Sequence, residues 1–161
     1  MDEHRENGTD GTLRLDTIGV VRNGVTDARD EEWGRVVSEI QLRPELADGL
    51  LGLEQFSHVM VLFFMHEARF DAVTQLTRRP RDRTDMPLVG VFAQRARHRP
   101  NPIAATTVEL KRVERSSLFV RGLDAIDGTP VLDVKPHVPA FDAPGHPRIP
   151  DWISRLMEGY F

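Results

Sequence analysis

Cysteine is absent from this chain of 161 residues. Its absence excludes a disulfide framework, a thiolate zinc site and a cysteine nucleophile. Long apolar runs are also missing. The longest, residues 59–65, has the length of a buried strand and falls far short of the roughly 18 residues that span a bilayer. Residues 1–12 are acidic and polar, unlike a signal peptide, so we expect a cytoplasmic protein with no membrane segment.

Two kinds of ligand motif are missing as well. No G-x-G-x-x-G follows a predicted strand, so the sequence does not support a Rossmann-type cofactor site. The histidines His4, His137 and His146 lack the spacing of metal ligands, and we predict no metal site. The net charge of −4 does not by itself indicate a nucleic-acid-binding protein.

The charges are, however, distributed unevenly. Residues 1–32 contain nine acidic side chains and four arginines, whereas residues 78–99 contain seven arginines against only Asp82 and Asp85. A cationic patch of this density could bind phosphates even on an acidic protein. The alternative is an exposed loop whose arginines are simply solvated.

Hydrophobic patterning predicts a mainly β protein. The clearest alternation places Val36, Ser38, Ile40 and Leu42 on one face of a strand. We expect strands at residues 13–21, 35–42, 58–64, 88–93, 103–113, 117–123 and 131–134, with exposed loops at residues 22–34, 69–87 and 137–147. Short helices are expected from Pro44 and Pro150. The pattern indicates a disordered tail at residues 1–12 and one small β-barrel domain at residues 13–161.

The most informative segment is GVFAQRARHRPNPI at residues 90–103. Its two prolines restrict the residues before them to extended conformations. If the segment is extended, Arg95, Arg97 and Arg99 would point the same way and could bind carboxylate or phosphate through planar, bidentate contacts. The alternative is a rigid connector with solvated arginines.

This segment resembles the signature of the TsaA-like (TrmO) family, whose usual form is close to GVFATRSPxRPNPIG. Three other blocks agree in order and spacing. TIGVVR at residues 17–22 resembles the opening IGVIRS-type strand, and LEQFSH at residues 53–58 resembles the LEGFSH block. LDAIDGTPVLDVKP at residues 123–136 resembles the DxxDGTPxLDIKPY block. The resemblance implies a small β-barrel that binds S-adenosylmethionine outside the Rossmann scheme, commonly as a homodimer. It also implies a methyltransferase, and the best-known activity of the family is N6-methylation of threonylcarbamoyl-adenosine beside the tRNA anticodon.

The resemblance also implies roles for individual residues. Arg95 falls on the arginine of the family's ATR triplet, a cofactor contact, and His66 with Glu67 falls on a histidine–glutamine pair that contacts the cofactor. A further contact falls on Glu31 and Glu32, although the family's proline–glutamine pattern is missing there. The remaining cofactor contacts fall on the segment that cradles the adenosine and methionine parts, namely Leu123, Asp124, Ala125, Ile126 and Asp127.

S-adenosylmethionine carries a sulfonium, an ammonium, a carboxylate and a ribose diol. Asp124 and Asp127 could accept hydrogen bonds from the diol or the ammonium, and Arg95 could bind the carboxylate. Positioning and desolvation can supply much of the acceleration of an in-line methyl transfer. A base is needed only if the nucleophile sheds a proton, and His66 is the candidate. Two plainer interpretations stay open, a structural histidine at the strand end and a simple turn at residues 127–130.

Three functions remain open. Methylation of tRNA would place Arg97, Arg99, Asn101 and Lys135 against the substrate, although Lys135 could instead close a surface ion pair. Methylation of a small metabolite is favoured by the acidic composition and by the missing C-terminal domain, which many bacterial tRNA-modifying members have. Departures from the family pattern also favour a small metabolite as the substrate, and they lie at Glu67, Ala96, His98 and Ala104. The third function is a non-catalytic sensor that binds the methyl donor and signals through a partner.

Overall fold

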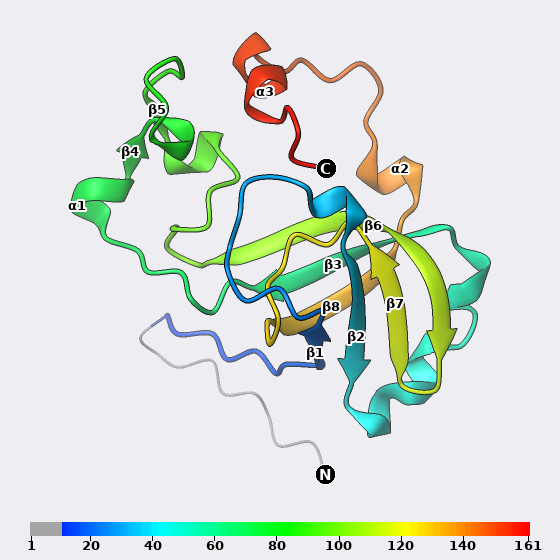
Figure 1. Cartoon of the computed structure of the whole chain (residues 1–161). Coiled ribbons are helices and arrows are strands. Elements are labelled where there is room, and N and C mark those ends of the chain that lie inside the picture. Colours follow the sequence, from blue (N-terminus) through cyan, green and yellow to red (C-terminus); the bar gives the residue numbers. More distant parts are fainter. Residues whose placement is uncertain (1–10) are drawn as a thin grey trace.

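The computed structural model describes residues 11–161, and its centre is a closed antiparallel barrel (Figure 1). Around the barrel the strands follow the order β1, β2, β7, β6, β3, β8. Their bounds are β1 Gly19–Arg22, β2 Val37–Leu42, β3 His58–Phe64, β6 Ile103–Glu114, β7 Ser117–Arg121 and β8 Pro130–Pro136. The predicted mainly β barrel with short flanking helices is confirmed. The predicted disordered tail falls almost wholly outside the described residues.

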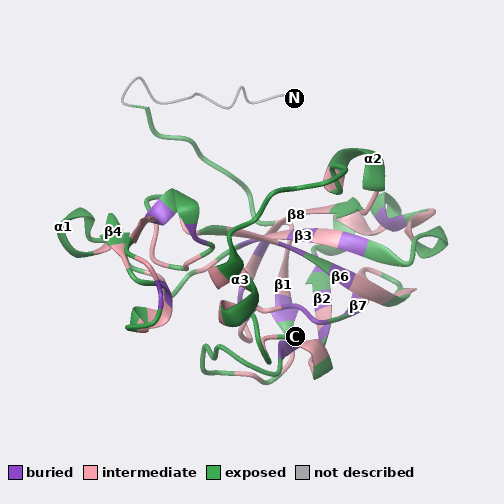
Figure 2. Cartoon of the chain, turned by 90° about the horizontal axis from the view of Figure 1, so that it is seen from above, coloured by how far each residue is buried: buried purple, intermediate pink, exposed green. Residues whose placement is uncertain are grey.

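The barrel interior is built by strict alternation along the strands. In β2, Ser38, Ile40 and Leu42 are buried while Val37 is exposed, as the sequence pattern predicted. In β3, every second residue points inward, because successive side chains of a strand face opposite sides. Figure 2 shows these buried positions along the barrel strands. The most deeply buried core side chains are Val21, Ile40, Val59, Val61, Phe63, Leu118, Val120, Leu123 and Val131.

The first strand is shorter than predicted. β1 begins at Gly19, because β2 and β8 pair only with residues 19–22. Leu13 and Leu15, which the prediction placed in the strand, are exposed. Of the preceding residues, Ile18 still donates its backbone N–H to the carbonyl of Val131 at 2.8 Å. The apolar pattern therefore extends further towards the N-terminus than the pairing of β1 with its neighbouring strands.

Residues 65–102 form a lobe that projects from the barrel between β3 and β6 (Figure 1). These two strands pair directly up to Phe64 and Ile103. The neck of the lobe is closed by the Met65 N–H, which donates to the Pro102 carbonyl at 2.8 Å. The lobe contains α1 Ala72–Gln75, β4 Thr77–Arg78, η4 Pro80–Asp82, β5 Val89–Gly90 and η5 Val91–Ala93.

Two predictions within the lobe were wrong. The expected loop at residues 69–87 contains α1 and β4, and the expected strand at residues 88–93 is only the two-residue β5 followed by a 3₁₀ turn. The cause is a buried side chain that the local pattern does not reveal. Gln94 donates from Nε2 to the carbonyls of Arg78 at 3.0 Å and Val89 at 3.2 Å, which ties β4 to β5.

The remaining helices are short and flank the barrel. They are η1 Trp33–Arg35, η2 Pro44–Leu50, η3 Leu53–Gln55, α2 Pro139–Asp142 and α3 Asp151–Leu156. The predicted helix starts are confirmed, since η2 begins at Pro44 and α3 begins just after Pro150. After α3 the chain returns towards η1 (Figure 1). Among residues 11–161, no helix has the length and apolarity needed to cross a bilayer.

Candidate functional site

The first half of β6 is not paired with β7, because β7 does not extend along it. Within the described residues, β7 pairs with β6 only from Glu109 to Glu114. The loop after β7 takes the place of a strand here. From this loop Asp124 accepts a hydrogen bond at Oδ1 from the Thr106 hydroxyl at 2.6 Å. Thr106 is buried, and Asp124 is half-buried at the edge of the barrel.

Arg95 reaches the same edge from the lobe. Its guanidinium Nη2 donates to the backbone carbonyl of Ala105, the residue before Thr106. The rest of the Arg95 side chain is exposed. A carboxylate and a guanidinium predicted from separate sequence blocks are thus anchored on consecutive residues of β6.

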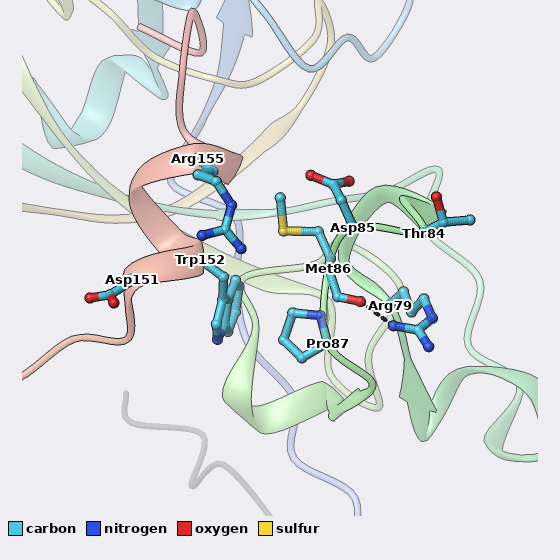
Figure 3. Close-up of a pocket in the computed structure, with 8 residues that line it drawn as sticks. All are labelled: Arg79, Thr84, Asp85, Met86, Pro87, Asp151, Trp152 and Arg155. Atoms are coloured by element: carbon cyan, nitrogen blue, oxygen red, sulfur yellow. Dashed lines mark hydrogen bonds between the residues drawn. The ribbon is translucent and has the colours of Figure 1, made fainter.

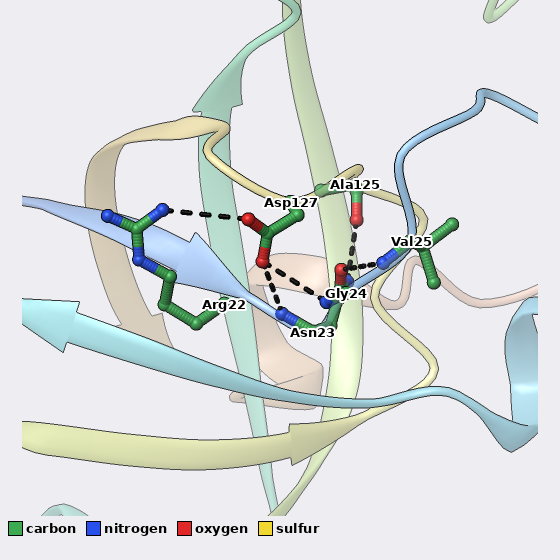
Figure 4. Close-up of polar contacts among 6 residues, drawn as sticks. All are labelled: Arg22, Asn23, Gly24, Val25, Ala125 and Asp127. Carbon is green, nitrogen blue, oxygen red and sulfur yellow. Dashed lines mark hydrogen bonds and ion pairs between the residues drawn. The ribbon is translucent and has the colours of Figure 1, made fainter.

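Asp127 has a different role from Asp124, and Figure 4 shows its contacts. Its Oδ1 accepts the backbone N–H of Asn23 at 2.8 Å and that of Gly24 at 3.1 Å. Its Oδ2 lies 3.6 Å from Nη1 of Arg22. The two backbone hydrogen bonds, with the nearby Arg22 charge, lower the pKa of this carboxyl below its ordinary value. Asp127 therefore clamps the loop after β1 to the loop before β8.

The other members of the predicted segment 123–127 are buried or half-buried. Leu123 and Ala125 are buried in the barrel core, so their side chains are not accessible to a ligand. The Ala125 carbonyl accepts from the Asn23 side-chain amide at 2.9 Å. Ile126 is half-buried, and its carbonyl accepts from Thr129 N–H at 3.2 Å. Within this segment, Asp124 is the carboxylate that bonds to a barrel strand and to Tyr160.

Glu31 and Glu32 are exposed and lie just before η1. Glu32 adopts a left-handed backbone conformation, with φ of 59°, and its carboxylate lies 3.6 Å from Arg35. The backbone of this loop is engaged by the end of the chain. Glu32 N–H donates to the Gly159 carbonyl and Trp33 N–H to the Tyr160 carbonyl, each at 2.9 Å.

We call residues 159–161 the tail strap. From it, the Tyr160 hydroxyl donates to Oδ2 of Asp124 at 2.6 Å, so the strap reaches the carboxylate that Thr106 holds from the other side. Sequence reasoning did not single out Tyr160. The available signal was its status as the one tyrosine of the chain, which says nothing about its contacts.

His66 and Glu67 follow β3 at the neck of the lobe, and both are exposed. Among residues 11–161, no hydrogen bond or ion pair joins either side chain to Asp124 or Arg95. Their predicted roles rest on the family resemblance rather than on a contact. Both side chains are free to turn towards a ligand.

The predicted substrate residues do not form one surface. Arg97 is exposed and donates to His98 Nε2 at 3.1 Å, whereas Nη1 of Arg99 donates to the carbonyls of Gln94 and Ala96 at 3.2 and 3.4 Å. Since Arg95 bonds elsewhere, the three arginines do not point the same way. The segment after η5 is not an extended strand, so the condition for that alignment fails.

Asn101 and Lys135 lie apart from each other. Asn101 is exposed at the neck, and its carbonyl accepts from Ile103 N–H at 2.7 Å. Lys135 stands opposite Met60 on the barrel, four residues along β3 from the neck, or about 13 Å at the rise of a strand. Its Nζ lies 2.6 Å from Oδ2 of Asp133. The ion-pair interpretation of Lys135 is therefore confirmed as a contact.

An open hollow of about 550 Å³ lies between the lobe and α3 (Figure 3). Trp152 and Arg155 of α3 face Met86 and Pro87 of the lobe across it. None of the predicted cofactor or substrate residues lines this hollow. Within the described residues, no group of three or more His, Asp or Glu side chains is placed to hold a metal ion.

Comparisons with known proteins show the family of this chain. The family model of the tRNA-methyltransferase O N-terminal domain matches residues 29–143. A probable S-adenosyl-L-methionine-binding protein of Methanothermobacter thermautotrophicus is 38% identical over 141 residues, which are 85% of this chain and 98% of that protein. The human tRNA (adenine(37)-N6)-methyltransferase is 40% identical over 110 residues, which are 68% of this chain and 24% of that enzyme.

A solved structure shows the same fold. The crystal structure of TrmO from Pseudomonas aeruginosa superposes with a TM-score of 0.68 at 34% identity, over 85% of this chain and 61% of that one. The chain also spans only 37% of a related protein from Archaeoglobus fulgidus that is named as a probable S-adenosyl-L-methionine-binding protein. The family match, the identities and the barrel agree, and the chain belongs to the TsaA-like (TrmO) family.

Proposed function

We propose that this chain binds S-adenosylmethionine at the open half of β6 and transfers its methyl group to an acceptor. The observation that supports this most is the anchoring of Asp124 and Arg95 on Thr106 and Ala105. Both residues stand where the family signature has cofactor contacts. Relatives named as a probable S-adenosyl-L-methionine-binding protein and as a putative S-adenosylmethionine-dependent methyltransferase add to the proposal.

The side chains present fit the donor molecule. A carboxylate offers about four lone-pair sites. Thr106 and Tyr160 take one site on each oxygen of Asp124, which leaves acceptors for a ribose diol or an ammonium group. Arg95 has further N–H donors for the carboxylate of the methionine part. Asp127 is occupied by backbone N–H groups, so we assign it to holding the loop rather than to the ligand.

When bound, the cofactor supplies an electrophilic methyl group, and the chain supplies position. Asp124 and Arg95 fix the donor by opposite charges at one edge of the barrel, and Glu31, Glu32 and Glu67 flank it as the family resemblance implies. Holding both reactants in line provides much of the acceleration. An N6 nucleophile sheds its proton during transfer, and we assign His66 to accept it.

For the acceptor, we propose tRNA, with methylation at N6 of threonylcarbamoyl-adenosine beside the anticodon. The named activity of the human relative, 40% identical over 110 residues, supports this assignment. Of the three arginines in the signature segment, Arg97 is best suited to a phosphate, since it is exposed and bonded only to His98. Arg99 is less suited, because part of its guanidinium holds the loop through the carbonyls of Gln94 and Ala96.

The first experiment measures cofactor binding. Titration calorimetry with S-adenosylmethionine or S-adenosylhomocysteine should show micromolar binding by the natural chain. Asp124→Asn removes the charge but keeps the shape, and it should weaken binding at least tenfold. Asp133→Asn, on β8, is the matched control and should bind normally. No binding by the folded natural chain at millimolar ligand would refute the proposal.

The second experiment identifies the acceptor. Labelled methyl groups should enter tRNA taken from cells that lack this methylation, and transfer should fall steeply as salt is raised, because phosphate contacts release counterions. Arg97→Glu should reduce incorporation strongly. Arg115→Glu, the same change in the turn between β6 and β7 at the far end of the barrel, should not.

Two other outcomes would change the assignment. Label appearing only in small molecules of a cell extract would favour a metabolite methyltransferase. The departures from the family pattern at Ala96 and Ala104 favour the same function. Donor binding without any transfer would favour a sensor, as the archaeal relatives named only for binding would allow.

We further propose a homodimer. The lobe exposes four large apolar side chains, which a partner surface would remove from water. These are Val73, Leu76, Leu88 and Phe92. Light scattering should give the mass of two chains, and Phe92→Glu should shift it to one. A natural chain that stays monomeric at high concentration would contradict this.

A further inference from the structure

The tail strap contacts two separate parts of the chain, the segment at the start of η1 and the Asp124 carboxylate. Its backbone accepts the N–H groups of Glu32 and Trp33 at 2.9 Å. Its Tyr160 hydroxyl reaches Asp124 at 2.6 Å. The strap also lies so close to η1 that a Cβ added at Gly34 would stand 2.5 Å from the backbone carbon of Phe161. A side chain at position 34 would therefore push the strap away.

The lobe holds the strap from the other side. The guanidinium of Arg81 lies 5.3 Å from the centre of the Tyr160 ring, within the range of a cation–π contact. Nε of Arg81 also lies 3.6 Å from Oδ1 of Asp30, in the loop before η1. The ring of Tyr160 is thus enclosed by the loop, the lobe and the barrel edge.

The direction of the hydrogen bond is fixed by the surroundings. Burial of the phenol and the neighbouring charge of Asp124 both raise the pKa of Tyr160 above its ordinary value. The hydroxyl therefore keeps its proton throughout the neutral range and donates to the carboxylate. Together with Thr106, it holds both oxygens of Asp124 in one orientation.

We propose that the tail strap is a wall of the cofactor site, in which Tyr160 is a positioning residue that orients the Asp124 carboxylate for the ligand. This inference rests on the proposed function. By the same contacts, the strap fixes the loop that contains Glu31 and Glu32 relative to Asp124. Binding of the donor then requires the strap to stay in place. A plug, in contrast, would have to leave the site before the donor could bind.

The first test removes single hydroxyl groups. Tyr160→Phe keeps the ring, its contact with Arg81 and the backbone hydrogen bonds, and it deletes only the donor to Asp124. Thr106→Val deletes the opposite donor. Each change should weaken binding of S-adenosylhomocysteine about tenfold, the effect expected of a hydrogen bond to a charged group. Thr107→Val, on the exposed face of the same strand, is the matched control and should bind as the natural chain does.

The second test displaces the strap without touching Asp124 or Tyr160. Gly34→Ala should move the strap and weaken binding at least as much as Tyr160→Phe does. Gly49→Ala is the matched control, since a Cβ there meets nothing within 4 Å. The melting temperature of each variant reports whether the barrel is intact, so a loss of binding in a folded variant is attributable to the strap.

A spectroscopic readout separates positioning from general stability. Because the chain has a single tyrosine, fluorotyrosine incorporated in its place gives one fluorine NMR signal. Adding S-adenosylhomocysteine should shift that signal in the natural chain and leave it narrow. In Asp124→Asn without ligand, the phenol should ionise at lower pH than in the natural chain, because a charge that raises its pKa is gone.

The outcomes are distinct. If the natural chain does not bind the donor or its demethylated product, the proposed function fails and this inference fails with it. If it binds and Tyr160→Phe and Gly34→Ala bind equally well, only the inference is overturned. Tighter binding by either variant also overturns it, because the strap would then be a plug over the site.

Discussion

Asp127 offers the sharpest test of how the loops beside the site are held. Its carboxylate accepts two backbone N–H groups, at 2.8 and 3.1 Å, from a loop more than a hundred positions away in sequence. Asp127→Ala deletes the oxygen that accepts both hydrogen bonds and leaves those N–H groups to water. We expect loss of stability rather than a specific loss of cofactor binding.

The magnitude follows from the contacts. A hydrogen bond to a charged group contributes about 1.5–3 kcal/mol when well shielded. About a third of the Asp127 side chain is exposed, at 32%, so water replaces part of the interaction. We therefore expect Asp127→Ala to lower the free energy of unfolding by about 2 kcal/mol in total. For a domain of this size, that corresponds to a fall in Tm of about 4–8 °C.

The pH dependence gives an independent check. Because the hydrogen bonds from Asn23 and Gly24 lower the pKa of Asp127 in the folded state, its ionised form stabilises the fold. That contribution is present above the unfolded-state pKa of about 4 and is lost as the pH falls through the lower folded value. Asp127→Asn keeps the shape without the charge, so it should differ from the natural chain near neutral pH and converge with it in acid.

Urea unfolding at neutral and acidic pH measures both effects. Asp48→Ala, which removes an exposed carboxylate on η2, is the control and should change little. A stability difference for Asp127→Asn that stays constant or grows towards acid would refute the clamp. So would full stability of Asp127→Ala with complete loss of cofactor binding, since Asp127 would then be a ligand contact.

Three further changes test the barrel and η1. Gly19→Ala should lower the free energy of unfolding in urea by about 2 kcal/mol or more, because its Cβ would stand 2.4 Å from the Gln41 carbonyl oxygen. An unchanged free energy would mean that β1 and β2 can separate. Phe63→Ala should cost about 3–5 kcal/mol, because the ring fills the barrel interior, and a cost below about 1 kcal/mol would contradict that packing. Trp33→Phe removes the hydrogen bond from Nε1 to the Arg29 carbonyl at 2.8 Å, so the free energy of unfolding should fall by about 1–2 kcal/mol. An unchanged Tm would show that water replaces this hydrogen bond.

The sequence was most informative where one face of a strand is buried. The bounds of β3 match the predicted strand, and the inward face of β2 matches the predicted alternation, because burial of every second side chain is a local property. The first residue of β1 was not predictable from the sequence, since it depends on how far β1 and β8 pair. The short β4 and β5 were missed for a similar reason, because Gln94 joins them through side-chain hydrogen bonds.

The candidate site remains a prediction, and the structure adds the contacts of its residues. The motif resemblance selected Asp124 and Arg95, and the structure places both on neighbouring residues of β6. The motif did not separate Asp124 from Asp127, because their difference lies in which distant loop each contacts. Tyr160 belongs to no block and comes from beyond the resembling region, so only the folded chain shows its bond to Asp124.

The neck of the lobe has a consequence for how such a protein can change over evolution. β3 and β6 are hydrogen-bonded up to Phe64 and Ile103, so the barrel register does not depend on the length of the chain between them. The entropic cost of closing a flexible loop rises only slowly, by about 0.6 kcal/mol for each doubling of its length. Insertions and deletions within residues 65–102 are therefore inexpensive for the barrel, provided that Arg81 and Arg95 keep their places. A lineage could remodel the parts of the lobe between Glu67 and Arg95 towards a new acceptor while keeping the residues of the proposed donor site.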